Sequence, residues 1–181
     1  GCVLVVGSGL AGLLHVQLAR ALGAGPVVAV DVVDYRLQAA FKLGADAAIS
    51  GHEDVPARLR EITGGHLADL VVLATGAEPA IRQALQSVER HGTVLFFAPG
   101  HPEATLPLPL NDLFWRNELT LTSTYAASPA DFTTAMELVR TGRVKVRESI
   151  RHRLGLGEAA LGFRLVAEAG ESLKVILEPQ R

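Results

Sequence analysis

Short apolar runs alternate with segments of helical periodicity along roughly the first hundred residues of the chain. The runs are continuously apolar, a pattern typical of parallel strands that helices cover on both faces. The expected strands are residues 2–6, 27–30, 47–49, 70–73 and 93–97, and the expected helices are residues 10–22, 35–43, 55–62 and 79–88. This order predicts an α/β fold built on a parallel sheet.

Beyond residue 100 the regular alternation ends. Residues 101–110 contain three prolines and are not expected to form regular structure. The elements expected after them are a helical turn at 111–116, a sixth strand at 119–123, a helix at 130–140 capped by Ser128, a short basic strand beyond Gly142, a helix near 158–168 and a last strand at 173–177.

A glycine-rich turn follows the first expected strand and opens the first expected helix, on which Leu10, Leu14, Leu18 and Leu22 share one side. The turn fits the pattern G-x-G-x-x-G with the residues Gly7, Ser8, Gly9, Leu10, Ala11 and Gly12. Gly7 permits a tight turn, Gly9 lets a pyrophosphate approach the backbone, and Gly12 lets the helix pack close to the sheet. The backbone N–H groups of residues 9–11 and the helix dipole would supply the anion site. The alternative is a tight turn that binds nothing.

An aspartate ends the second strand at the position where such folds hold a ribose. Asp31 lies 19 residues after Gly12, and a carboxylate there accepts hydrogen bonds from ribose hydroxyls and repels a 2′-phosphate. This favours NAD(H), although Asp31 could also be only a solvated strand end. Asp34 is the weaker candidate for the same task. Arg36 could lie over the adenine or its ribose, which leaves an opening for NADP(H).

Ligands of such sheets bind beyond the carboxyl ends of the strands. The residues at the ends of the fourth and fifth strands are therefore expected to line a cofactor groove: Ala74, Thr75, Gly76, Phe97, Ala98 and Pro99. Buried strand ends without a ligand would have the same composition. Together with the glycine turn, the pattern predicts a Rossmann-type doubly wound parallel sheet that binds a dinucleotide.

Composition and charge narrow the remaining possibilities. The chain has 181 residues, a formal net charge of −2 and one cysteine. It has no basic patch for nucleic acid, no apolar run long enough to span a membrane, and no cysteine pair for a disulfide or a cysteine-built zinc site. A reducing, cytoplasmic location is expected. Cys2 is expected in the core as a small apolar residue.

These motifs, in this order, make the chain similar to the zinc-type medium-chain alcohol and polyol dehydrogenase family. The resemblance spans essentially the whole chain and rests on the segments Val3-Leu4-Val5-Val6, Leu22-Gly23-Ala24, Lys42-Leu43-Gly44-Ala45-Asp46, Ala68-Asp69-Leu70-Val71 through Gly76, Gly92-Thr93-Val94-Leu95, Glu118-Leu119-Thr120-Leu121, and Ile150 through Leu154 with Leu173 through Leu177. It divides the chain into an NAD(H)-binding domain at 1–125 and a C-terminal segment at 126–181 that returns to a catalytic domain.

The resemblance implies hydride transfer between NAD and a secondary alcohol or its carbonyl, with zinc as the Lewis acid. The family's zinc ligands lie in an N-terminal domain that these residues do not include, so we expect no catalytic or metal-binding residue here and no activity of this chain alone. Gly51-His52-Glu53 echoes the family's zinc motif, but Pro56 replaces its next glycine, and His52 is interpreted as a surface histidine. The resemblance also implies association through the sixth-strand edge, residues 118–123.

Two other functions stay open. One is a stand-alone NAD(H)-binding or sensing module. The other is the cofactor domain of a zinc-free enoyl or quinone reductase, which typically has a basic residue where Asp31 stands. A coding sequence upstream of residue 1 that carries a zinc motif would favour the dehydrogenase over the module.

Overall fold

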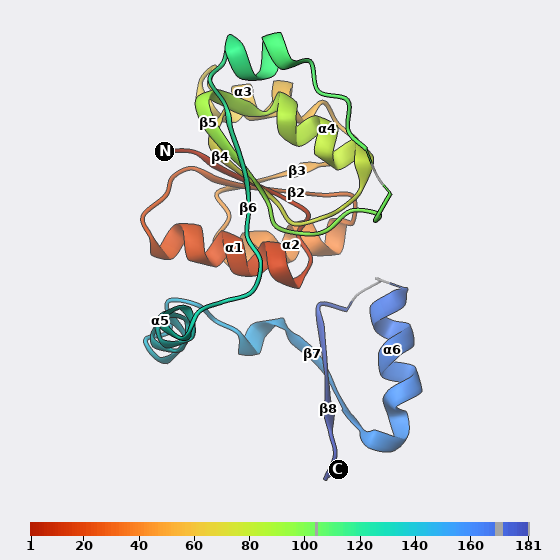
Figure 1. Ribbon diagram of the computed structural model, residues 1–181. Helices are drawn as coiled ribbons and strands as arrows, with labels where there is room; N and C mark the ends of the chain where they lie inside the picture. Colours follow the sequence, from red (N-terminus) through yellow and green to blue (C-terminus); the bar gives the residue numbers. More distant parts are fainter. Residues whose placement is uncertain (104, 169–171, 181) are drawn as a thin grey trace.

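The computed structural model describes residues 1–103, 105–168 and 172–180. Its main feature is a parallel six-stranded sheet with the strand order β3-β2-β1-β4-β5-β6 (Figure 1). The strands are β1 (Val3–Val6), β2 (Val27–Asp31), β3 (Ala47–Ser50), β4 (Ala68–Leu73), β5 (Val88–Phe96) and β6 (Thr120–Ser123). The order reverses between β1 and β4, as in a doubly wound Rossmann-type fold, which confirms the predicted fold class.

Helices cover both faces of this sheet, and the central strands β1 and β2 are buried on both faces. The pair α1 (Leu10–Ala21) and α2 (Asp34–Lys42) packs on one face, and the pair α3 (Val55–Thr63) and α4 (Glu78–Gln86) packs on the other (Figure 1). Alternate residues of β1 serve the two cores. Val3 and Val5 join the cluster under α1 and α2, and Leu4 and Val6 join the cluster under α3 and α4.

Helix α1 buries a different stripe from the leucines that share one side in the sequence. Leu13 and Val16 are fully buried against the sheet, whereas Leu22 is 74% exposed. The buried stripe also includes Gly12 and Gln17. The helix is apolar on more than one side, so hydrophobic spacing alone does not decide which side meets the sheet.

The C-terminal part forms a second, smaller layer of structure. Helix α5 (Pro129–Arg140) is followed by β7 (Ile150–Gly155), α6 (Ala159–Ala167) and β8 (Lys174–Glu178), and β7 and β8 pair in parallel as a separate sheet (Figure 1). Ser128 caps α5 as predicted, because its Oγ accepts a hydrogen bond from Asp131 N at 3.3 Å. The predicted division at residue 125 stays a prediction, and residues 169–171 and 181 of its second part lie outside the described residues.

Several contacts between described residues join the C-terminal part to the main sheet's helices, and one of them is a hydrogen bond from the Arg143 guanidinium to Ala21 O at the end of α1. Gln17 of α1 is buried, and its Oε1 accepts a hydrogen bond from Lys145 N at 2.7 Å. The Arg151 guanidinium lies 5.2 Å from the ring centre of Tyr35 on α2. None of these contacts has a local sequence signal, since each joins residues more than a hundred positions apart.

Most predicted elements are present, and their boundaries differ by a few residues. The largest difference is β5, which starts at Val88 instead of residue 93. Between Val88 and residue 93 the chain has Glu89, Arg90, His91 and Gly92, with His91 at a φ of 62°, so this stretch has no apolar run. The predicted helical turn at 111–116 is a short π-helix at Asn111–Trp115.

Candidate cofactor-binding site

A cavity of about 290 Å³ opens at the carboxyl ends of β1, β2 and β4, where the strand order reverses. Its wall includes six residues predicted for the cofactor site, which come from four separate segments: Gly7, Gly9, Asp31, Arg36, Ala74 and Thr75. The other lining residues are Val6, Val30, Val32, Gly51, Ala77, Pro79, Ala80 and Gln83. The topology thus brings the glycine turn and the strand-end aspartate to one opening.

The glycine turn has the geometry that its three glycines predict. Gly7 has a φ of 93°, a left-handed conformation that a side chain would strain. A Cβ at Gly12 would lie 1.8 Å from the Gly7 carbonyl oxygen, so only glycine fits where the helix meets the turn. A Cβ at Gly9 would meet nothing within 4 Å. The space over Gly9 is therefore open to a ligand.

The N-terminus of α1 begins at this turn without a side-chain cap. Gly9 is the N-cap residue, and Ser8 Oγ donates instead to Val30 O at 3.1 Å. The first N–H groups of a helix have no partner within the helix, and the helix dipole adds partial positive charge there. An anion such as a pyrophosphate fits this end of the cavity on chemical grounds.

Asp31 is held rigidly at the end of β2. It is 8% exposed, and its Oδ2 accepts a hydrogen bond from Ser8 N at 2.7 Å while its Oδ1 accepts one from Val33 N at 3.0 Å. Arg36 Nη1 lies 3.6 Å from Oδ2. An ionised carboxylate has about four acceptor positions, so the two backbone N–H groups leave acceptor capacity for further donors, even with Arg36 beside Oδ2. Two neighbouring hydroxyl groups, as on a ribose, match that capacity.

The remaining predicted residues lie outside the cavity wall. They are Ser8, Leu10, Ala11, Gly12, Gly76, Phe97, Ala98 and Pro99, and their contact with a cofactor stays a prediction.

Structural roles are visible for several of these residues. A Cβ at Gly76 would lie 2.3 Å from Pro99 O, so the ends of β4 and β5 pack directly against each other. Phe97 packs edge-to-face on His15, with ring centres 4.5 Å apart. His15 Nδ1 lies 2.9 Å from Ala11 O, within the first turns of α1.

Sequence reasoning missed a large part of the cavity wall. This part includes Gly51 after β3 and Ala77, Pro79, Ala80 and Gln83 at the start of α4. The rule that ligands lie beyond the carboxyl ends of strands could have indicated Gly51 and Ala77, since they follow β3 and β4. No sequence signal indicated Gln83, whose contact depends on how α4 packs beside the β3–α3 loop.

The described residues include no group of three or more histidine, cysteine, aspartate or glutamate side chains that could hold a metal ion. His52 is exposed on the loop after β3, as expected. Cys2, directly before β1, is buried in the core under α3 and α4, also as expected, and burial together with the nearby Asp69 charge raises the pKa of its thiol to about 11.

The strand order and the glycine turn together define a Rossmann-type α/β fold of the dinucleotide-binding class. The model of the family described as "Zinc-binding dehydrogenase" matches residues 11–141, and the chain belongs to this family. The predicted resemblance is thereby confirmed.

The sequence matches to related dehydrogenases extend over nearly all of the chain. It is 32% identical to L-threonine 3-dehydrogenase of Bacillus licheniformis, over 98% of this chain and 51% of that protein. It is 31% identical to sorbitol dehydrogenase 1 of Saccharomyces cerevisiae, over 97% of this chain and 50% of that protein. An alcohol dehydrogenase structure from Thermotoga maritima has a TM-score of 0.89 at 27% identity, over 97% of this chain and 49% of that one. The chain spans about half the length of these relatives.

No helix among the described residues is both long enough and apolar enough to cross a membrane. The cytoplasmic location expected from the sequence stays a prediction.

Proposed function

We propose that this chain is the NAD(H)-binding part of an alcohol or polyol dehydrogenase. The observation that carries the proposal is the single cavity that joins the open glycine turn to the buried Asp31 carboxylate. The N-terminus of α1 at Gly9 is partially positive and suits the anionic pyrophosphate, and the Asp31 carboxylate accepts hydrogen bonds from the hydroxyl groups of the ribose. The sorbitol and L-threonine dehydrogenases among the relatives support an alcohol as the substrate of the whole enzyme.

Asp31 also supports NAD(H) over NADP(H). A 2′-phosphate would place its charge beside a carboxylate that is 8% exposed, and like charges at such a site repel strongly. The Arg36 guanidinium lies 3.6 Å from the Asp31 carboxylate, so part of the positive charge of Arg36 is already balanced by Asp31. The ion pair favours a ligand without a third phosphate.

Titration with NADH and NADPH, followed by nicotinamide fluorescence, tests this proposal. The wild-type chain is expected to bind NADH roughly tenfold or more tightly than NADPH, because close like charges cost at least 1.4 kcal/mol, about a factor of ten. Asp31→Asn is expected to narrow that preference. Asp34→Asn is the matched control, since Asp34 is exposed and outside the cavity wall. Absence of NADH binding, or an equal loss of preference in both variants, would refute the proposal.

We propose further that two copies associate through the edge strand β6. The strand pairs with β5 on one side and ends the sheet order, so its other edge offers backbone groups to a partner strand. Light scattering after size-exclusion chromatography measures the mass directly. A proline at Leu121 is expected to reduce association, and a monomeric wild-type chain would refute the proposal.

A further inference from the structure

The part of the cavity beyond Asp31 forms a continuous wall. Gly51 N donates a hydrogen bond to Asp31 O at 2.9 Å, and a Cβ at Gly51 would lie 3.0 Å from Val32 Cγ1. Gln83 Nε2 in turn lies 3.1 Å from Gly51 O. Asp31, Val32, Gly51 and Gln83 therefore follow one another along the wall. If Asp31 holds the ribose, as the proposed function requires, the base attached to that ribose lies against Gly51 and Gln83.

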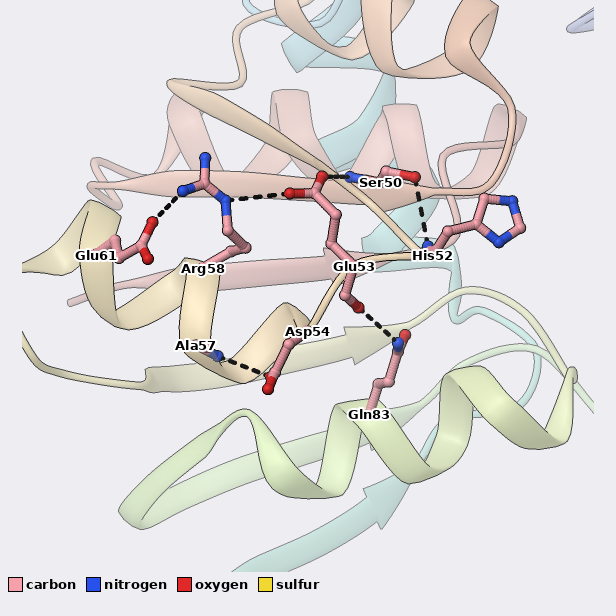
Figure 2. A network of polar contacts seen from close by, with 8 residues as sticks. All are labelled: Ser50, His52, Glu53, Asp54, Ala57, Arg58, Glu61 and Gln83. Atoms are coloured by element: carbon pink, nitrogen blue, oxygen red, sulfur yellow. Dashed lines mark hydrogen bonds and ion pairs between the residues drawn. The ribbon is translucent and has the colours of Figure 1, made fainter.

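The Gln83 amide has a fixed orientation. Its Nε2 donates to Gly51 O at 3.1 Å and to Glu53 O at 3.3 Å, and Figure 2 shows the side chain reaching from α4 to the Glu53 carbonyl. A flipped amide would place an oxygen against two carbonyl oxygens, which is unfavourable. Both amide hydrogens are used in this way, so the part of Gln83 left for a ligand is Oε1, which can only accept.

The loop that orients Gln83 is itself held by polar contacts on both sides (Figure 2). Ser50 N donates to Glu53 Oε1 at 3.1 Å, and Arg58 Nε lies 3.2 Å from Glu53 Oε2. Asp54 Oδ1 accepts from Ala57 N at 3.1 Å and caps α3. These contacts fix the loop backbone, so the two carbonyls that hold the Gln83 amide keep their positions.

We propose that Gln83 selects adenine as the base of the dinucleotide, with Oε1 accepting a hydrogen bond from the 6-amino group. Hypoxanthine has a carbonyl oxygen at this position in place of the amino group. Two acceptors would then face each other, and the hydrogen bond between the base and Gln83 Oε1 would be lost. A site that pairs with a specific polar group rejects an analogue that lacks it more strongly than an apolar pocket does.

The test compares NAD with nicotinamide hypoxanthine dinucleotide by isothermal titration calorimetry. The wild-type chain is expected to bind NAD up to about tenfold more tightly, because one net hydrogen bond contributes about 0.5–1.5 kcal/mol. Gln83→Leu is expected to bring the affinity ratio close to one. Gln86→Leu is the matched control, because Gln86 is an exposed glutamine on the same helix and outside this cavity, and it keeps the wild-type ratio.

The affinity ratio, rather than the affinity itself, distinguishes recognition of the base from support of the loop. Loss of the loop contact alone weakens both dinucleotides equally and leaves their ratio unchanged, which would overturn the proposal. A wild-type ratio near one would overturn it while NAD binding still upheld the proposed function. If neither dinucleotide binds the wild-type chain, the proposed function fails and this inference fails with it. Gln83→Met, unbranched and of similar length, provides a second variant with the same expected ratio.

Discussion

Gly9 and Gly12 lie three positions apart in the same turn, and alanine is expected to act at them through different causes. A Cβ at Gly9 would meet nothing within 4 Å, and the Gly9 φ of −66° is one that alanine adopts freely. A Cβ at Gly12 would lie 1.8 Å from the Gly7 carbonyl oxygen and 3.4 Å from Val5 Cγ1. Gly9→Ala should therefore affect the ligand, and Gly12→Ala should affect the fold.

The size of each effect follows from these distances. A carbon and an oxygen that are not bonded stay about 3.2 Å or more apart, so α1 would have to move by more than about 1 Å to admit a methyl group at Gly12. Overpacking of this kind costs about 1–3 kcal/mol, which lowers the Tm of a chain this long by roughly 3–10 °C. At Gly9 the cost to stability is expected to stay within about 1 kcal/mol, the loss of a favourable N-cap residue.

Two measurements on each variant separate these effects. Thermal unfolding followed by circular dichroism gives the Tm, and titration with NADH gives the affinity. Gly9→Ala is expected to keep the wild-type Tm within about 3 °C and to lose roughly tenfold or more in NADH affinity, because a methyl group occupies the space of a phosphate oxygen. Wild-type affinity in Gly9→Ala would refute the placement of the pyrophosphate. A wild-type Tm in Gly12→Ala would refute the close contact with Gly7.

Two further predictions concern groups outside the cavity. At pH 8 a thiol with a pKa of about 11 is ionised in about one molecule in a thousand, and a thiol with the ordinary pKa of 9.0 in about one in ten. Alkylation of Cys2 by iodoacetamide should therefore be at least about a hundredfold slower in the folded chain than in the chain unfolded by guanidinium. Equal alkylation rates would contradict the burial of Cys2. Backbone N–H groups of Leu67 and Arg90 lower the pKa of Glu89 below its ordinary value of 4.5, so its stabilising effect is present above pH 4.5 and is lost as the pH falls through the lowered value. Urea unfolding at pH 6 and pH 3 should therefore show a smaller loss of stability on acidification in Glu89→Gln than in the wild type, and identical losses would count against the prediction.

Most parts of the site that the sequence predicted lie at or just after the carboxyl ends of strands, as Ala74 and Thr75 do after β4. The glycine turn joins β1 to α1 directly, and Asp31 ends the next strand, so their position follows from the strand order alone. The contact of Gln83 with Gly51 spans 32 residues and depends on how α4 lies beside the loop before α3. No local pattern encodes that relation.

The same reasoning explains the differences in the fold. Continuous apolar runs identify strands with two buried faces, so the strands of the main sheet were predictable to within a few residues, except for the start of β5. On α1, Leu14 and Leu18 compete with Leu13 and Val16 for the sheet, and the sequence offers no preference between the two sides. Gly12 decides it, because its close contact with Gly7 sets the rotation of the helix about its axis.

The two backbone hydrogen bonds to Asp31 have a consequence for attempts to change cofactor preference by mutation. The carboxylate receives N–H groups from Ser8 and Val33, so it takes part in folding before any ribose arrives. Its replacement by a small or basic residue would leave two largely buried donors without acceptors, at a cost of about 1–3 kcal/mol each. A change of cofactor in this scaffold therefore needs a second substitution that supplies a new acceptor at the turn, and specificity and stability here would have to evolve together.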